Sequence, residues 1–396
     1  MDEKMKAVRL YADWDPKPGF KLGYKDIDKK LTYLGSQVWR NPKIKIEDVP
    51  VPTVGPSEVL IEVKRCGICG SDVHMNQAND EGYIWYPGLT AFPATLGHEF
   101  AGTVVKAGEK AVNKRTSKPF EAGEPVTVEE MVWCGECKPC CDGFPNHCER
   151  LQEIGFSIDG AYAKYITVPA KLCWSLKKLE GKYKDIFQNG SLVEPSSVAY
   201  NAVIERGGGI RPGQNVVILG AGPIGAAATS ILKRAGASVV VVSEPDPNRA
   251  NMAKKMGADY TIDPTKESFV EKVKEYTDNE GAALYLEATG LPHIVTDDIQ
   301  NAIWECKEVN STVVIVARAE QRMPVMGEVF QVRRARIVGA QGHSGHGTFA
   351  NVISLMSAGM DMSPMITKTI GLDDLPENLK LLQTDRENCK ISVKID

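Results

Sequence analysis

A glycine-rich turn between a predicted strand and a predicted helix constrains the fold of this chain more than any other feature. Residues 215–219 form an apolar run, and an alanine-rich helical pattern follows the turn directly. Glycines in this context allow a tight turn, close approach of the backbone to a pyrophosphate, and packing of the helix on the strand. The turn therefore predicts a dinucleotide site with contacts from Gly220, Gly222, Pro223, Ile224 and Gly225.

An acidic residue ends the second predicted strand of this region. Glu244 lies 19 positions after Gly225 (244 − 225), at the spacing where a carboxylate accepts hydrogen bonds from the adenosine ribose. Because the same carboxylate would repel a 2′-phosphate, NAD is favoured over NADP as the cofactor. Arg249 follows closely and can accommodate a 2′-phosphate, which leaves some use of NADP open. The alternative, an unrelated strand-to-helix turn, does not explain the acidic residue.

The two halves of the chain have different periodicities. The first half has short alternating runs at 5–10 and 57–65 with Gly and Pro punctuation, typical of a compact β-barrel, and the polar segment between these runs is expected to be loop with one short hairpin. The second half alternates apolar runs with helical stretches, as in a parallel sheet built from βαβ units. Its apolar runs are 215–219, 238–242, 283–286 and 312–317. We therefore expect an α/β protein with a mainly β first half and a doubly wound second half.

Length and charge exclude several classes of partner. The chain has 396 residues, which at roughly 150 residues per domain favours two domains. A net charge of −4 creates no basic field for nucleic acid. No apolar run reaches the about 18 residues of a membrane span, and the charged start has no signal-peptide pattern. We expect a cytoplasmic protein that binds small molecules and neither nucleic acid nor membrane.

A cluster of cysteines predicts a structural metal site. Four thiolates can close a tetrahedron around zinc and leave no position for substrate; free thiols, a redox pair and an iron–sulfur cluster are the alternatives. The chain lacks an export signal, so metal binding is favoured over disulfides for its ten cysteines. Cys141 falls outside the spacing and is expected to be a spectator. The C-x2-C-x2-C-x7-C set is Cys134, Cys137, Cys140 and Cys148.

A second group of potential ligands precedes this cluster. Cys69 forms a C-x2-C pair with Cys66, and His98 and Glu99 follow Gly97 directly. A zinc knuckle would need a second cysteine pair, but the other candidates already form a complete set, so we expect one of the pair to be a lone ligand. Sulfur, nitrogen and oxygen donors together suit a catalytic zinc with one open position. The sequence thus predicts two zinc ions per chain.

Taken in order, these motifs resemble those of the zinc-dependent medium-chain dehydrogenase/reductase superfamily, in particular its polyol branch of sorbitol and threonine dehydrogenases. The resemblance covers nearly the whole chain. It rests on residues 67–74 (Gly-Ile-Cys-Gly-Ser-Asp-Val-His), residues 97–99 (Gly-His-Glu), the four-cysteine cluster and residues 220–225. It implies a GroES-like catalytic domain formed by residues 1–195 and 339–396, and a Rossmann domain formed by residues 196–338.

The resemblance also implies a role for each matching residue. Glu194 occupies the position of a second cysteine in simple alcohol dehydrogenases, and is expected to bind the catalytic zinc directly or through water. Ser71 and His74 match the proton relay of the superfamily, whereas Cys66 matches no ligand position. The residues that match ligands of the catalytic zinc are Cys69, His98 and Glu99.

The implied activity is oxidation of a secondary hydroxyl by NAD, in which zinc lowers the pKa of that hydroxyl. A polyol is the expected substrate, and a cyclic polyol or inosose is favoured. An aromatic loop at residues 75–95 is expected either to form the substrate lip or to pack on the barrel. The alternatives are an alcohol or threonine dehydrogenase, a zinc-free quinone-type reductase, and a non-enzymatic NAD-sensing zinc protein. The resemblance further implies a homo-oligomer, a tetramer or a dimer.

The remaining histidines and cysteines are expected to have structural roles. We expect His343 and His346 to lie in a plain surface loop. His147 is expected to be exposed or to lie beside the metal cluster. The isolated cysteines, which should be buried thiols, are Cys173, Cys306 and Cys389.

Overall fold

The computed structural model describes residues 3–318 and 321–396, and the chain divides into two compact units. The first unit comprises the chain up to Glu194 together with Ile366–Asp385 and Lys390–Asp396. The second comprises Pro195–Met365 and Arg386–Cys389. The chain therefore leaves the first unit, builds the second, and returns to complete the first.

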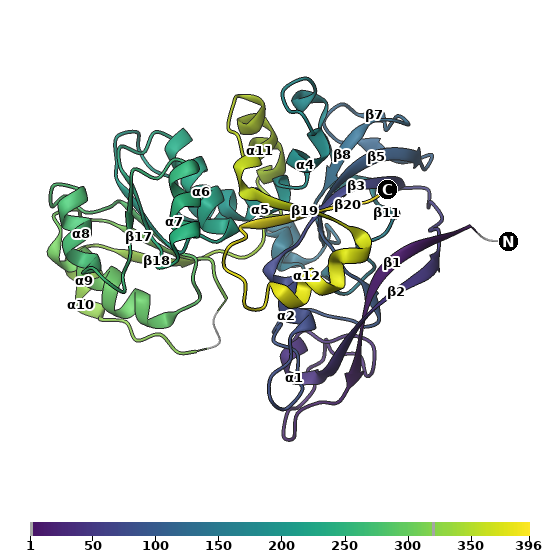
Figure 1. The fold of residues 1–396 in the computed structure, drawn as a ribbon, viewed down its shortest axis with the longest axis horizontal. Coiled ribbons are helices and arrows are strands. Elements are labelled where there is room, and N and C mark those ends of the chain that lie inside the picture. The colour runs from purple at the N-terminus through teal and green to yellow at the C-terminus, as the bar shows by residue number, and fades with distance from the viewer. Residues whose placement is uncertain (1–2, 319–320) are drawn as a thin grey trace. The chain divides into compact units, whose positions relative to one another are not determined.

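A mixed sheet forms the centre of the first unit, in the order β12-β8-β5-β3-β20-β19, with β11 also paired to β3. The C-terminal strand β20 runs antiparallel to β3 (Figure 1), so the end of the chain completes a sheet begun near its start. Val59, Ile61 and Val63 of β3 are buried in the core of this unit. The strands are β3 (Glu58–Gly67), β5 (Glu99–Ala107), β8 (Pro125–Val128), β11 (Tyr165–Pro169), β12 (Cys173–Ser175), β19 (Ile366–Gly371) and β20 (Lys390–Lys394).

A long antiparallel hairpin joins β1 (Lys4–Trp14) to β2 (Trp39–Pro50), and β4 (Ala94–Thr95) pairs with β1. The prediction of loop with one short hairpin between the first two runs was therefore wrong. Residues of β2 after Trp39 alternate between half-buried and exposed, so its sequence is too polar to indicate a strand. Short strands complete the unit: β6 (Val112–Asn113), β7 (Lys118–Pro119), β9 (Met131–Val132) and β10 (Gln152–Glu153).

Helices in the first unit are short. The N-terminus of α2 follows β3 after two residues, which brings the end of a central strand and the first turn of a helix together. The α-helices are α1 (Gly35–Val38), α2 (Gly70–Asn76), α3 (Lys138–Cys141), α4 (Ile186–Gly190) and α12 (Leu375–Leu381), and short 3-10 segments lie at Pro145–His147, Ala170–Leu172, Lys177–Leu179 and Leu372–Asp374.

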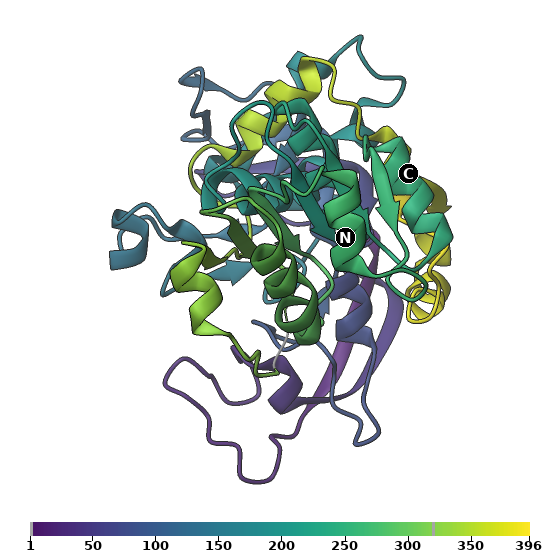
Figure 2. The same cartoon turned by 90° about the vertical axis from the view of Figure 1, so that its left-hand side faces the viewer.

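The second unit is built on a parallel sheet in the order β15-β14-β13-β16-β17-β18. This order, with the first strand of the unit central, is that of a doubly wound dinucleotide-binding fold, and the predicted fold class is confirmed. Figures 1 and 2 show the helices of this unit along the faces of its sheet. The strands are β13 (Val216–Leu219), β14 (Val240–Ser243), β15 (Tyr260–Ile262), β16 (Leu284–Glu287), β17 (Thr312–Ile315) and β18 (Arg336–Gly339).

The helices of the second unit follow the strands in alternation, as the sequence periodicity predicts. Val217 and Leu219 of β13 are buried in a cluster with apolar residues of α8 and α9. The helices are α5 (Val193–Tyr200), which crosses from the first unit, α6 (Pro223–Arg234), α7 (Pro247–Lys255), α8 (Phe269–Tyr276), α9 (Gln300–Glu305), α10 (Gly327–Val332) and α11 (Thr348–Ser357), with π-helical turns at Asn201–Arg206 and Ile294–Ile299 and a 3-10 turn at Ser363–Met365. In the described part of the chain, no helix is both long and apolar enough to cross a membrane.

Residues 339–365, which we expected in the catalytic domain, group with the second unit. Arg234 of α6 donates a hydrogen bond to the Ala358 carbonyl (3.0 Å), and the Asn201 amide donates one to the Gly342 carbonyl (2.9 Å). These bonds join residues 339–365 to the first helices of the second unit. By compactness, this segment therefore belongs with the second unit, whereas we expected the domain boundary after residue 338. The domain boundary itself stays a prediction.

His343 is fully buried, which corrects the expectation of a plain surface loop. Its ring packs on Phe349 with centroids 4.8 Å apart, and the Thr348 hydroxyl donates a hydrogen bond to its carbonyl. The flanking glycines suggested an open turn, but α11 begins at Thr348 and covers the imidazole. His346 is exposed, as expected.

Candidate active site and metal centres

Three predicted ligands meet at the junction of β3, α2 and β5. Cys69 is the N-cap residue of α2, and Glu99 begins β5 and pairs with Gly67 of β3. Gly97 has a φ of 93°, a conformation that favours glycine, and it turns the chain so that His98 and Glu99 enter the sheet together. The ligand atoms of Cys69, His98 and Glu99 all lie within 4.8 Å of one another. One sulfur, one nitrogen and one carboxylate oxygen in such a group fit zinc.

Asp72 and Tyr162 support His98. The Asp72 Oδ2 accepts hydrogen bonds from the Cys69 backbone N–H and lies 3.0 Å from the Tyr162 hydroxyl. The Asp72 Oδ1 lies 3.7 Å from the His98 Nδ1. A carboxylate that faces one imidazole nitrogen orients the ring and favours the tautomer whose other nitrogen can bind a metal. Phe156 packs on the His98 ring, with centroids 4.6 Å apart.

A buried lysine binds the third predicted ligand. The Lys390 ammonium donates hydrogen bonds to both Glu99 oxygens (2.6 and 2.8 Å) and to the Ile68 carbonyl (2.9 Å). Both side chains of this ion pair are only 1% exposed. Each Glu99 oxygen therefore has one lone pair turned to Lys390 and keeps another for a metal ion. Lys390 also offsets one negative charge of the ligand group.

Burial and charge act together on the groups around this centre. Burial raises the pKa of Asp72, and it raises the pKa of Tyr162 well above its usual value. Burial acts to lower the pKa of His98, but the negative charges of Asp72 and Cys69 outweigh it, and that pKa lies well above its usual value. A raised histidine pKa means that the surroundings favour positive charge at the imidazole. A divalent cation bound there would supply such a charge.

The other predicted catalytic residues lie on α2 and α5. Ser71, in the first turn of α2, has a buried hydroxyl oxygen without a hydrogen-bond partner among the described residues. His74 lies in the last turn of α2 and is exposed. Glu194 is buried in the first turn of α5, outside the compact group of three ligands, but its charge contributes to the raised pKa values of His98 and Lys390. Its carboxylate lies within 4.8 Å of that of Glu130.

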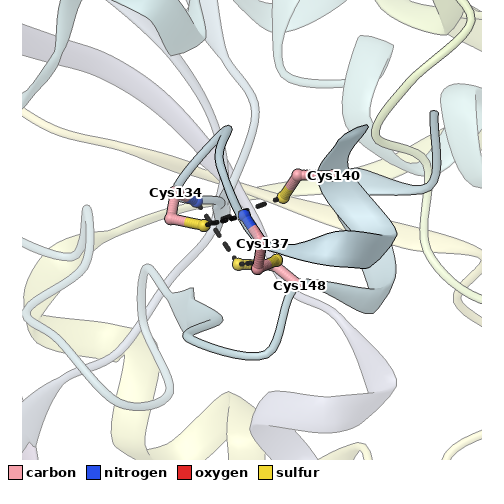
Figure 3. A group of neighbouring side chains, drawn as sticks. All are labelled: Cys134, Cys137, Cys140 and Cys148. Carbon is pink, nitrogen blue, oxygen red and sulfur yellow. Dashed lines mark hydrogen bonds between the residues drawn. The ribbon is translucent and has the colours of Figure 1, made fainter. Parts of the chain in front are cut away.

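The four-cysteine cluster forms a separate centre, which Figure 3 shows with its sulfur atoms converging. The Cys134 and Cys140 sulfurs are 3.9 Å apart, and those of Cys137 and Cys148 are 3.8 Å apart. The Glu136 backbone N–H lowers the pKa of Cys134 to about 6, whereas burial raises the pKa of Cys140 to about 12. All four ligand atoms lie within 4.8 Å of one another, as a tetrahedral zinc site requires.

The residues around the four-cysteine cluster are arranged mostly as expected. The Cys141 thiol is exposed and donates to the Glu136 carbonyl, outside the group of four. His147 is exposed. Cys66, Cys173 and Cys306 are buried, whereas Cys389 is only partly buried.

The glycine-rich turn lies between β13 and α6, with Gly222 as N-cap and Pro223 as the first helical residue. Gly220 has a φ of 97°, and a side chain at Gly222 would meet no atom within 4 Å. This side of the turn is therefore open, as the approach of a pyrophosphate requires.

Glu244 is fixed at the end of β14. Its carboxylate accepts hydrogen bonds from the backbone N–H groups of Ala221 (2.8 Å) and Asp246 (3.0 Å). These bonds couple the acidic residue to the turn itself. The Arg249 backbone N–H bonds to Asp246 at the start of α7, and its side-chain Nε is buried without a hydrogen-bond partner in the described residues. The predicted ribose acid and the predicted glycine contacts thus belong to one local arrangement.

Comparison with known proteins identifies the family. Residues 55–178 match the alcohol dehydrogenase GroES-like domain, and residues 223–358 match the zinc-binding dehydrogenase domain. The chain is 62% identical over 392 residues to the scyllo-inosose 3-dehydrogenase of Thermotoga maritima, covering 98% of this chain and 99% of that protein. The chain belongs to the zinc-binding dehydrogenase family.

More distant relatives and a solved structure agree with this assignment. An L-threonine 3-dehydrogenase of Alteromonas mediterranea is 30% identical over 332 residues, which cover 84% of this dehydrogenase and 90% of that protein. A solved alcohol dehydrogenase structure from Thermotoga maritima superposes with a TM-score of 0.97 at 62% identity, over 98% of this chain and all of that one. The protein is a zinc-type dehydrogenase, and zinc and NAD are the cofactors expected for it.

Several residues around the sites of this dehydrogenase were not found from the sequence. Lys390 lies in an alternating strand, 291 positions from Glu99. Nothing in the neighbouring sequence indicates that it binds the Glu99 carboxylate. Tyr162 and Phe156 lie 64 (162 − 98) and 58 (156 − 98) positions after His98, too far for a local pattern to link them to it. Asp72 could have been found, because it lies at the third position of a helix whose N-cap is a predicted ligand, where acidic residues favour capping.

The aromatic loop before His98 packs partly on the first unit, and its role as a substrate lip stays a prediction. Tyr83 and Phe92 are buried, and the Phe92 ring packs on Trp39 with centroids 5.2 Å apart. Tyr86 instead packs on Phe156 (5.2 Å), which itself contacts His98. Trp85 is 51% exposed. Packing on the first unit thus accounts for part of the loop, and the rest lies beside the candidate metal centre.

Proposed function

We propose that this dehydrogenase oxidises a secondary hydroxyl of a cyclic polyol or inosose with NAD, as a scyllo-inosose 3-dehydrogenase. The observation that carries the substrate is the 62% identity to the Thermotoga maritima enzyme of that name over almost the full length of both chains. The compared relatives named L-threonine 3-dehydrogenase are 28–35% identical. An inosose and an inositol share a ring with adjacent hydroxyl groups, so a polyol is the substrate class to test.

The catalytic zinc is proposed to bind Cys69, His98 and Glu99. These donors fit the ion by element and by their mutual approach within 4.8 Å, and His98 and Glu99 are buried. Zinc supplies a Lewis acid that lowers the pKa of a substrate hydroxyl, as it does for water. Glu194 is proposed to bind the ion directly or through a water molecule. The structural zinc is proposed to bind the four-cysteine cluster.

The chain's own residues are proposed to move the hydroxyl proton. Ser71 is suited to accept it, because its buried hydroxyl has no other partner in the described residues and lies two positions from Cys69 in the first turn of α2. The exposed His74, one turn further along the helix, is suited to release the proton to solvent. The second unit holds the dinucleotide through the turn at Gly220 and the carboxylate of Glu244.

A homo-oligomer is part of the proposal. The edge strand β18 has no partner on its outer side among the described residues, and Val325, Met326 and Val332 nearby are exposed apolar side chains. A second copy paired there would cover an unpaired sheet edge. We further propose a cytoplasmic location, since none of the ten cysteines forms a disulfide.

A screen of substrates tests the proposed function. Purified protein with NAD and each of scyllo-inosose, myo-inositol, sorbitol, L-threonine and a simple secondary alcohol should produce NADH fastest with the cyclic compounds. With NADP the rate should fall by about 100-fold, because Glu244 would repel the 2′-phosphate. A preference for threonine would support the threonine dehydrogenase alternative, and no turnover with any compound would favour an NAD-binding protein without activity.

A further inference from the structure

Tyr162 contacts both chain segments that carry the predicted zinc ligands. Its side chain is fully buried. A Cβ built on Gly97 would lie 2.8 Å from the Tyr162 ring, so the ring packs directly against the residue before His98. The Tyr162 backbone N–H also donates to the Leu96 carbonyl (2.9 Å). The ring and backbone of Tyr162 thus fix the turn that delivers His98 and Glu99.

The hydroxyl of the same residue reaches the other segment. It lies 2.9 Å from the Gly67 carbonyl and 3.0 Å from the Asp72 Oδ2. Gly67 and Asp72 flank Cys69 in the sequence, at the end of β3 and in the first turn of α2. One side chain therefore joins the segment of the cysteine ligand to the segment of the histidine ligand, without being a ligand itself.

The two oxygens of Asp72 have different surroundings. The Oδ2 accepts a hydrogen bond from the Cys69 N–H and lies 3.0 Å from the Tyr162 hydroxyl, whose single hydrogen it shares with the Gly67 carbonyl. The Oδ1 has no hydrogen-bond partner among the described residues and lies on the side of His98, 3.7 Å from its Nδ1. Because the Cys69 N–H and the Tyr162 hydroxyl both contact the Oδ2, rotation of the carboxylate would disrupt these contacts, and its other oxygen stays turned to the imidazole.

We propose that the Tyr162 hydroxyl is a positioning group for the catalytic zinc, acting on His98 through Asp72. The proposal rests on the proposed function, because it requires a zinc ion at Cys69, His98 and Glu99. Partners that orient a ligating histidine contribute about 10–100-fold to metal affinity. Loss of the hydroxyl alone should therefore loosen the ion without removing any ligand.

Tyr162→Phe tests this, because phenylalanine keeps the ring against Gly97 and removes only the hydroxyl. The holoenzyme is mixed with a chromophoric chelator, and zinc release is followed for both ions. The phase from the catalytic site should be about 10–100-fold faster in Tyr162→Phe, and the phase from the four-cysteine cluster should be unchanged. Tyr285→Phe is the matched control, since Tyr285 is equally buried but lies in the second unit.

A double-variant series tests the route through Asp72. Asp72→Asn should also accelerate release from the catalytic site, and Tyr162→Phe should add less than twofold to it. Cobalt substitution gives a second readout: the visible absorption of the catalytic cobalt should shift in Tyr162→Phe and not in Tyr285→Phe. Full additivity of the two substitutions would overturn the proposed route.

The outcomes separate this inference from the proposed function. If the wild-type protein holds only one zinc, the proposed function fails and the positioning role fails with it. If it holds two and Tyr162→Phe releases them as the wild type does, the positioning role alone is overturned. If both phases accelerate together as the midpoint of thermal unfolding falls, Tyr162 has a general structural role and the inference is wrong.

Discussion

The two candidate metal centres of this dehydrogenase are assembled in opposite ways. The four-cysteine cluster comes from one short stretch, residues 134–148, and its thiols accept hydrogen bonds from backbone N–H groups of that same stretch, as from Glu136 to Cys134 (3.4 Å). The candidate catalytic centre takes residues from β3, α2, β5 and β20, and its ion pair joins positions 291 apart. A local site is encoded by spacing, whereas a site that joins distant segments depends on the whole first unit.

The difference extends to what each centre should contribute. In the four-cysteine cluster the ligands themselves supply much of the packing of their loop, since Cys137 and Cys148 belong to a small buried apolar cluster with Leu151. Loss of zinc there should therefore cost stability. In the candidate catalytic centre the scaffold is already fixed by the Lys390–Glu99 pair and by Tyr162, so loss of zinc should cost activity and leave the fold intact. Four substitutions can break or sharpen this contrast.

Cys69→Ala should have the largest effect. It removes a ligand of the proposed catalytic zinc, and without the Lewis acid turnover should fall by about 10³-fold or more. Metal analysis should then find one zinc per chain, and NAD titration followed by fluorescence should give an unchanged affinity. Retained turnover would remove this zinc from the mechanism, and a large fall in the unfolding temperature would contradict the view that the scaffold is fixed without it.

Lys390→Met should destabilise the protein strongly. It leaves the Glu99 carboxylate buried without its cation, and removal of one partner of a buried ion pair costs about 3–5 kcal/mol in the free energy of unfolding. Denaturant unfolding measures this change. Lys390→Arg keeps the charge and should cost less, which makes it the matched control. Equal stability of Lys390→Met and the wild type would show that Glu99 is compensated in another way.

The sequence predicted most of what is local. The glycine turn, the four-cysteine spacing and the βαβ alternation each lie within a few residues to a few tens of residues. They predicted the fold class and the family, and the comparisons with known proteins confirmed both. The spacing of Glu244 after the turn belongs to the same kind of signal. Such features can be predicted from neighbouring residues, because the structure that they form, a turn or a tetrahedron of thiolates, is itself local.

What depends on tertiary contacts was not predicted. The sequence of β2 was interpreted as loop, because its pairing with β1, which is distant in the sequence, is visible only in the folded structure. His343 looked exposed beside glycines, although α11 buries it. Lys390 carries no local pattern that sets it apart from a surface lysine of a terminal strand. For β2 and Lys390 a partner from another part of the chain decides the environment, and for His343 the packing of the helix that begins five residues later (348 − 343) does.

Cys148→Ser should reduce stability by a smaller amount than Lys390→Met. It removes one of four thiolates, so the structural zinc should be lost and the free energy of unfolding should fall by on the order of 3 kcal/mol. Turnover per folded molecule should change less than twofold. Thermal unfolding together with metal analysis checks both expectations. A loss of turnover as large as that of Cys69→Ala would show that the cluster takes part in catalysis.

Cys141→Ser should have the smallest effect, and it tests whether only the four cysteines of the predicted spacing bind zinc. Cys141 is adjacent to Cys140 in the sequence, yet its thiol is exposed and bonds to the Glu136 carbonyl, outside the group of four sulfurs. The substitution should therefore leave two zinc ions per chain and change the free energy of unfolding by no more than about 0.5 kcal/mol. If Cys141→Ser released zinc as Cys148→Ser is expected to, the cluster would exchange ligands between adjacent thiols. Sequence spacing alone would then not determine which thiols bind the structural zinc, and the contrast with a centre that depends on distant residues would be weaker.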